Sequence, residues 1–318
     1  MNNPIPFAML SALLLLFGCG SKTSQENNEN NSTSLAFPQY ENLKLGFTTQ
    51  NFLQAIPVSL ASSKAFIDYA AAEGFAWIEL RDPEATLTLE ECEEIASYAQ
   101  EKNIEVGYAI QKGLLDEDFW PTFEKGVRNA TVFEGPKTIR SLGSGQEFTD
   151  NPDKKGWTEG ELLQAVRHAD SAATIATQNG LQYVIENATE SFFNQSGQYY
   201  GITDLFALVS KNVGWQFDTA NPFSVSRVHP SPDSVQMYLL AHADNLHYIH
   251  LKAAQNGAAQ PVLMENPLDF ATVFQVMNER NIPYIAIELQ AADNEEQAYQ
   301  NMEESVAYLQ KQGFIATP

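Results

Sequence analysis

The chain has 318 residues and a formal net charge of −22, from 18 Lys and Arg against 40 Asp and Glu. Nucleic-acid binding relies on Lys and Arg at the phosphates, so this balance excludes nucleic acid as an expected partner. The length exceeds that of most single domains but suits one α/β barrel behind an N-terminal leader.

The first 18 residues have the pattern of an export signal. An apolar run over residues 6–17 is followed by Gly18 and Cys19. The run is too short to span a membrane, which takes about 20 apolar residues. The string Leu16-Phe-Gly-Cys19 resembles a bacterial lipobox, although no Lys or Arg precedes the run. It implies lipidation of Cys19 and an exported cell-envelope protein, anchored on the periplasmic or surface face. The alternatives are an ordinary secretory signal or an N-terminal core strand.

The segment after Cys19 is polar. Residues 20–36 are rich in Asn, Ser and Glu, and such a stretch cannot bury enough surface to offset its ordering entropy. We therefore expect a lipoprotein signal at 1–18, a flexible tether at 19–36 and a catalytic domain at 37–318. The other cysteine, Cys92, lies in a helical pattern and is interpreted as a packing residue.

Strand and helix signals alternate through the rest of the chain, which predicts a parallel sheet with crossover helices. Apolar runs predict strands at 44–48, 77–81, 105–110, 138–143, 181–186, 215–218, 248–250 and 285–288. Helical periodicity predicts helices at 62–73, 88–102, 119–130, 158–178, 203–211, 231–243, 268–281 and 295–312. Eight units favour closure into a (β/α)₈ barrel, and the sequence has no glycine-rich phosphate loop after its first strand.

Four of the later strands end in a side chain that can bind a metal: Glu186, Asp218, His250 and Glu288. Their separations are 218 − 186 = 32, 250 − 218 = 32 and 288 − 250 = 38 residues. A barrel of this kind uses about 31 residues per strand–helix unit, and its chemistry lies at the C-terminal ends of the strands. We therefore expect the four side chains to converge on one pocket.

This residue set predicts a particular kind of metal site. A carboxylate at the end of an apolar strand is costly unless it is paired, hydrogen-bonded or bound to a metal. Three carboxylates and one imidazole suit Mn²⁺ best, with Mg²⁺ and Co²⁺ as alternatives, rather than a structural zinc site. The competing interpretation is that each residue is an isolated salt-bridge or capping residue.

The sequence around these residues resembles the sugar isomerase/epimerase family of xylose-isomerase-like barrels, from about Leu43 to Phe314. The strongest matches are the strings at 184–187, 217–221, 248–252 and 286–289. The family includes ketose 3-epimerases, hydroxypyruvate isomerases and inosose dehydratases. The resemblance implies that Glu186, Asp218, His250 and Glu288 are the metal ligands. It also implies that the two glutamates act as acid and base across the substrate carbon.

Two departures from the family pattern concern the substrate. Many members have Asp-x-x-His where this chain has Asp218-Thr-Ala-Asn221, and many have Asp where Ala253 follows Lys252. Asn221 can bind a sugar hydroxyl but cannot exchange a proton. We expect substrate contacts from Lys252, Asn221, Glu79 and Arg140, with a salt bridge at the barrel mouth as the alternative for Glu79 and Arg140.

The sequence predicts a divalent-metal-dependent isomerase or epimerase that moves a proton on a small sugar or keto-sugar through an enediolate. A lyase or dehydratase on a keto-sugar or inosose is one alternative, because it begins with the same proton abstraction. A lipid-anchored barrel that binds sugar without converting it is the other. The substrate is expected to be a small carbohydrate, and the oligomeric state stays open.

Overall fold

We describe residues 35–194 and 197–316 from a computed structural model. The predicted signal, Cys19 and the predicted tether up to residue 34 lie outside these residues. Within the described part of the chain, no helix is both long enough and apolar enough to cross a membrane. Leu35 and Phe37, near the start of the described chain, are already buried.

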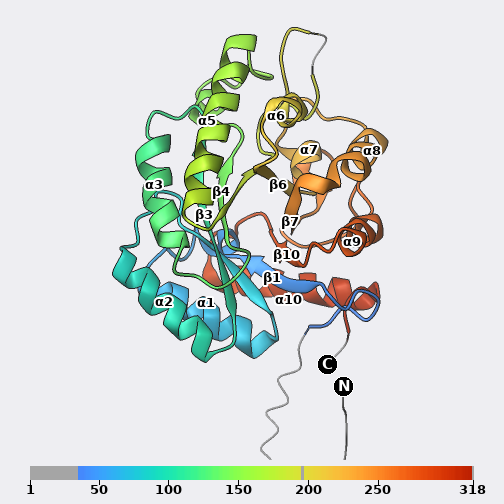
Figure 1. Cartoon of the computed structure of the whole chain (residues 1–318). Coiled ribbons are helices and arrows are strands. Elements are labelled where there is room, and N and C mark those ends of the chain that lie inside the picture. Colours follow the sequence, from blue (N-terminus) through green and yellow to red (C-terminus); the bar gives the residue numbers. More distant parts are fainter. Residues whose placement is uncertain (1–34, 195–196, 317–318) are drawn as a thin grey trace, which may run out of the picture. The chain divides into compact units, whose positions relative to one another are not determined.

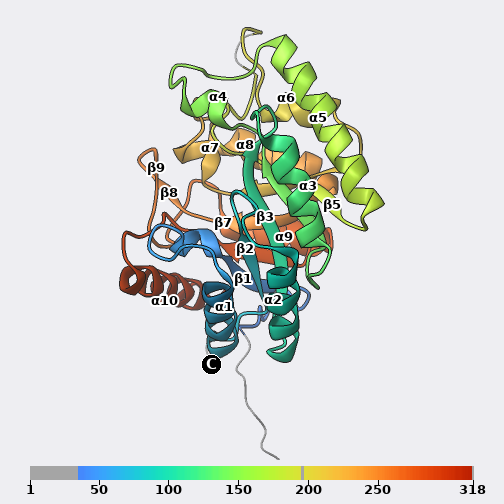
Figure 2. The same cartoon turned by 90° about the vertical axis from the view of Figure 1, so that its left-hand side faces the viewer.

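The strands form a closed parallel barrel with helices around its outside (Figures 1 and 2). Around the barrel the order is β1-β10-β7-β6-β5-β4-β3-β2, so each main strand pairs with its neighbours in the chain and the ends meet. The strands are β1 (Lys44–Thr48), β2 (Trp77–Arg81), β3 (Glu105–Gly113), β4 (Thr138–Leu142), β5 (Gln182–Glu186), β6 (Val213–Asp218), β7 (Leu246–Leu251) and β10 (Tyr284–Ile287). The predicted (β/α)₈ barrel is confirmed.

The helices begin and end where the sequence predicts, to within a few residues. Thr88 and Glu91 form the expected capping box, with each side chain accepting a hydrogen bond from the other residue's backbone N–H. Gly74 ends the first helix in the left-handed conformation, at φ 81°. The long helices are α1 (Leu60–Glu73), α2 (Leu89–Glu101), α3 (Phe119–Ala130), α5 (Glu159–Gln178), α6 (Ile202–Leu208), α8 (Pro232–His242), α9 (Phe270–Glu279) and α10 (Glu295–Lys311).

Side chains alternate between two cores. On β6, Trp215 and Phe217 are buried and contact each other. Both also contact the ring of Phe192 outside the barrel, and Trp215 contacts that of Tyr238. Asp218 and Gln216 therefore point inward, because successive strand residues face opposite sides. A separate small cluster fills the barrel interior: Trp77, Val184, Tyr248 and Ala286. Burial on both faces explains the nearly continuous apolar runs.

The structure adds short elements that the sequence analysis did not predict. Most follow the C-terminal ends of strands and therefore surround the barrel mouth. They are η1 (Thr49–Phe52), α4 (Gln146–Thr149), α7 (Asn221–Ser224) and a hairpin of β8 (Ala254–Gln255) and β9 (Ala258–Ala259), together with η2 (Ala243–Asn245) before β7. Segments of two to four residues are too short to show a periodicity.

Candidate metal centre

The structure brings the four strand-end side chains together. Glu186 and Asp218 are the last residues of β5 and β6, His250 lies in β7 in register with Asp218, and Glu288 directly follows β10. One potential ligand atom from each lies within 4.8 Å of those from the other three, and all four residues are buried. The convergence expected from the spacing is confirmed, and the cluster can bind a metal ion.

Two atoms of this cluster are short of partners. Oδ1 of Asp218 accepts hydrogen bonds from the backbone N–H groups of Ala220 and Asn221, at 2.8 and 2.7 Å. Among the described residues, Oδ2 of Asp218 and Nδ1 of His250 are buried and make no well-aligned hydrogen bond, and their nearest charged neighbours are Lys252 at 3.7 Å and Glu288 at 2.8 Å. A buried polar atom without a well-formed hydrogen bond costs roughly 1–3 kcal/mol, and a cation placed among these ligand atoms would satisfy both. The residues present therefore fit a divalent ion.

Three buried cations balance the carboxylates. Nζ of Lys252 lies 2.8 Å from Oε1 of Glu288, and Nη1 of Arg81 lies 3.1 Å from Oε2 of the same residue. Nη1 of Arg140 donates to Oε2 of Glu186 at 2.7 Å. Buried charges are tolerated when they are paired and hydrogen-bonded in this way.

Burial and the neighbouring cations have opposite effects on the pKa of each carboxyl group. Burial by itself raises the pKa of Glu186, but the charge of Arg140 outweighs it, so the pKa is lowered. Burial likewise raises the pKa of Glu288, but the charge of Lys252 outweighs it, and that pKa is lowered too. For Asp218, burial outweighs the effect of Lys252 and raises the pKa to about 6. Glu186 and Glu288 are therefore held ionised, as a base requires.

His250 is held between two groups of carboxylates. Its Nε2 lies 3.1 Å from Oε2 of Glu79, and its Nδ1 lies 2.8 Å from Glu288 and 3.7 Å from Glu186. Burial lowers the pKa of His250, but the charges of Glu79 and Glu288 outweigh it, so the pKa is well above the usual value. Without an ion, His250 is expected to carry both ring protons.

The four residues expected to contact substrate lie at different depths. Asn221, at the start of α7, donates to Oε1 of Glu186 at 3.3 Å and accepts from Lys252 at 3.3 Å. Lys252 and Asn221 therefore both contact the cluster. Glu79 and Arg140 are 1% and 0% exposed and contact His250 and Glu186 from inside the barrel. That the four contact substrate stays a prediction.

Three further side chains support this centre, and sequence reasoning missed two of them, Thr48 and Tyr248. Arg81, the last residue of β2, contacts Glu288 and approaches Glu186 to 3.8 Å. Thr48 and Tyr248 both donate to Glu79, at 2.9 and 2.6 Å. The available signal was the strand period, since Tyr248 precedes His250 by two residues and faces the same side.

A further buried carboxyl lies in the loop after β5. Glu190 is 1% exposed, its Oε1 accepts from the N–H of Ala188 at 3.0 Å, and its Oε2 has no partner among the described residues. Burial is the main cause that raises its pKa to about 7. Glu190 is thus largely protonated at acidic pH and begins to ionise near neutrality.

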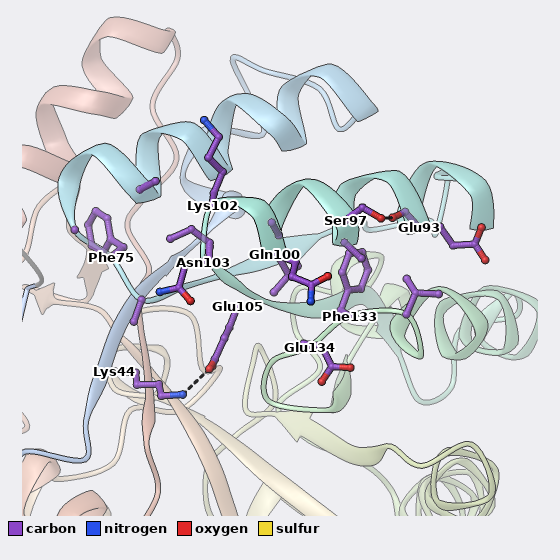
Figure 3. Close-up of a pocket in the computed structure, with 18 residues that line it drawn as sticks. Lys44, Phe75, Glu93, Ser97, Gln100, Lys102, Asn103, Glu105, Phe133 and Glu134 are labelled. Atoms are coloured by element: carbon purple, nitrogen blue, oxygen red, sulfur yellow. Dashed lines mark hydrogen bonds and ion pairs between the residues drawn. The ribbon is translucent and has the colours of Figure 1, made fainter. Parts of the chain in front are cut away.

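A large cavity lies away from the metal cluster. It has a volume of about 880 Å³, and the ion pair between Lys44 and Glu105 borders it, together with Phe133 and the C-terminal part of α2 (Figure 3). Lys44 and Glu105 begin β1 and β3, so the cavity belongs to the N-terminal side of the barrel. Barrel enzymes keep their chemistry at the opposite end, and we assign the site from the side-chain cluster.

With the barrel and its cluster established, comparisons with known proteins give the family. The model of the xylose isomerase-like TIM barrel family matches residues 67–312, which is more than half of the chain. The chain belongs to this family. A search of curated protein sequences finds no match. The family predicted from the strand-end motifs is confirmed.

Solved structures of this family have the same fold at low sequence identity. A D-psicose 3-epimerase with D-tagatose, from Clostridium cellulolyticum H10, is 13% identical with a TM-score of 0.61, over 87% of this chain and 100% of that one. A xylose isomerase-like barrel protein from Mycobacterium smegmatis in complex with magnesium is 14% identical with a TM-score of 0.61, over 85% and 97%. The IOLI protein with a bound zinc atom is 15% identical with a TM-score of 0.59, over 85% and 96%. At these identities the likeness establishes the fold alone.

Proposed function

We propose that the protein is a divalent-metal-dependent isomerase or epimerase of a small sugar or keto-sugar. The observation that carries this proposal is the buried cluster of Glu186, Asp218, His250 and Glu288, in which Oδ2 of Asp218 and Nδ1 of His250 make no well-aligned hydrogen bond. A bound ion would polarise substrate oxygens and so acidify the neighbouring C–H bond. Mn²⁺ is the proposed ion, because carboxylate-rich sets favour Mn²⁺ and Mg²⁺.

In the proposed reaction, Glu186 and Glu288 move the proton. One carboxylate abstracts it from the substrate carbon and the other returns it, through an enediolate. Arg81 contacts Glu288 and lies 3.8 Å from Glu186, so one guanidinium holds both groups in relation to each other. Lys252 and Asn221, which contact each other and the cluster, are proposed to bind substrate hydroxyls or the developing negative charge.

A lyase or dehydratase is the second proposed function. The buried ammonium of Lys252 supports it, because a held cation with protons to donate suits departure of a β-substituent. The same proton abstraction at Glu186 or Glu288 would precede that step. A barrel that only binds sugar is the third proposal, and it predicts no exchange of substrate protons with solvent.

The test is a screen of ketoses and 3-keto-sugars with added Mn²⁺ in deuterated solvent. Incorporation of deuterium at carbon would support proton abstraction even where no net product forms, and an eliminated product would assign the lyase. A protein that binds sugar and Mn²⁺ but exchanges no proton with any substrate would overturn both catalytic proposals.

We also propose that the protein is an exported lipoprotein anchored through Cys19. The lipobox-like string and the polar stretch that follows it support this location. An exported enzyme would meet free or oxidised sugars rather than phosphorylated cytosolic ones.

A further inference from the structure

Glu79 is a buried carboxylate that contacts the metal cluster from inside the barrel. It lies on β2 in register with Thr48 of β1, and its side chain points into the barrel. Four donor groups surround its two oxygens. Oε1 accepts from Thr48 at 2.9 Å and from Nη2 of Arg140 at 3.4 Å, while Oε2 accepts from the hydroxyl of Tyr248 at 2.6 Å and faces Nε2 of His250 at 3.1 Å. No oxygen is left over for a substrate.

The contact with Glu79 determines which nitrogen of His250 is available. A neutral imidazole carries one N–H, and the carboxylate of Glu79 retains that proton on Nε2. The lone pair is then on Nδ1, which lies 2.8 Å from Glu288 and 3.7 Å from Glu186. Histidine ligands of metals are commonly oriented by a carboxylate on the other ring nitrogen.

Arg140 acts on a second member of the cluster from the same side. Its two terminal nitrogens contact Glu79 at 3.4 Å and Glu186 at 2.7 Å. Arg140 is in register with Val184, two residues before Glu186, so it lies deeper along the barrel than the carboxylate it contacts. It is 0% exposed, and it also compensates the charge of Glu79.

We propose that Glu79 and Arg140 are positioning residues of the metal centre and do not contact substrate. Glu79 orients His250 with Nδ1 toward the carboxylates, and Arg140 orients Glu186 while it neutralises Glu79. One buried ion pair thus fixes a nitrogen ligand and an oxygen ligand together. This inference rests on the metal-binding part of the proposed function.

The test measures affinity for Mn²⁺ by calorimetry on the full chain. Glu79→Gln should weaken binding by roughly 10- to 100-fold, the loss typical of removing a partner behind a histidine ligand. Arg140→Lys retains the positive charge but loses the two-nitrogen contact, and should weaken binding about tenfold or more. The matched control is Glu134→Gln, the same change at an exposed carboxylate outside the cluster, which should bind Mn²⁺ close to wild type.

A second measurement separates an effect on the orientation of the His250 ring from a general destabilisation of the barrel. In the zinc-loaded protein with ¹⁵N-labelled histidines, His250 should give an Nε2–H signal protected from solvent exchange. Glu79→Gln should shift that signal or lose its protection, and Glu134→Gln should leave it in place. The chain has 5 histidines, so the signals can be assigned one by one.

The outcomes are distinguishable. Wild-type affinity for Mn²⁺ in folded Glu79→Gln and Arg140→Lys proteins would overturn this inference and leave the proposed function standing. Failure of the wild-type protein to bind Mn²⁺ would overturn both. If Glu79→Gln does not fold, the Mn²⁺ affinity of the Arg140→Lys protein is the test. Weakened Mn²⁺ binding supports the inference, and unchanged binding overturns it.

Discussion

The ammonium of Lys252 lies 2.8 Å from Oε1 of Glu288, and both groups are buried. The proposed base is thus held ionised by a cation from the neighbouring strand end. Lys252 is the foremost of the charges that lower the pKa of Glu288 against the effect of burial.

Replacing this cation should change the pH dependence of catalysis. In Lys252→Met the pKa of Glu288 should rise, and the acid limb of the pH–rate profile should move upward by about one unit or more. Lys211→Met, at an exposed lysine, is the control and should leave the profile in place. An unshifted acid limb in Lys252→Met would show that Lys252 does not set the ionisation of the base.

Removing either proposed acid–base group should abolish turnover without unfolding the protein. Glu186→Gln and Glu288→Gln keep the side-chain shape but cannot take up a proton, so we expect losses of about 10²-fold or more in rate. Solvent deuterium exchange measures the loss, and circular dichroism checks the fold. Glu134→Gln, at an exposed residue in the loop before β4, is the control. Retained activity in either active-site variant would contradict the mechanism.

Metal binding should release protons near neutral pH. The pKa of His250 is raised well above its usual value and that of Asp218 is raised to about 6. At pH 7 the histidine proton must therefore leave before Nδ1 can bind an ion, and affinity should rise as the pH rises above 7. Calorimetry in buffers of different ionisation enthalpy counts the released protons. Binding at pH 7 with no proton release would refute this protonation state.

Glu190→Gln should stabilise the protein at alkaline pH. The folded-state pKa of Glu190 is about 7, above the ordinary 4.5. Between these pH values the folded state therefore binds more protons than the unfolded state. Its favourable contribution is complete below pH 4.5 and is lost as the pH rises through 7. The loss is at most roughly 3 kcal/mol, from 2.5 units at 1.36 kcal/mol per unit.

The measurement for Glu190 is the free energy of unfolding in urea at pH 5 and pH 8. The glutamine variant should gain stability over wild type at pH 8 and little at pH 5. Glu124→Gln, at an exposed position on α3, should show no such difference. An equal effect of Glu190→Gln at both pH values would count against a buried, mostly protonated Glu190.

Lipidation predicts where the protein is found. In a bacterial host, the full chain should fractionate with membranes, and Cys19→Ser should move it out of the membrane fraction. The readout is detergent partitioning together with radioactive fatty-acid labelling. A wild-type protein that takes up no fatty acid would exclude the anchor.

The sequence predicts the barrel and its cluster well because both depend on short-range patterns. Glu186 and Asp218 end apolar runs, and the spacing alone places those ends at one mouth. Thr88 and Glu91 indicate the start of their helix because they form a local capping box. Such signals need only the residues a few positions away.

The network under the cluster could not be predicted in the same way. Glu79 contacts Tyr248 and His250, which are 169 and 171 residues later in the chain. Which strands lie opposite one another inside a barrel depends on its closure and stagger. The sequence therefore identified Glu79 as a site residue, for a substrate contact or a salt bridge at the barrel mouth, but could not identify His250 as its neighbour.

Glu186, Asp218, His250 and Glu288 are proposed to hold one divalent ion. The test is a titration of the metal-stripped protein with Mn²⁺, in which calorimetry or electron paramagnetic resonance monitors binding. We expect one ion bound per wild-type chain and loss of that binding in His250→Ala and Asp218→Ala. Binding of no ion, or unchanged binding in both variants, would contradict it.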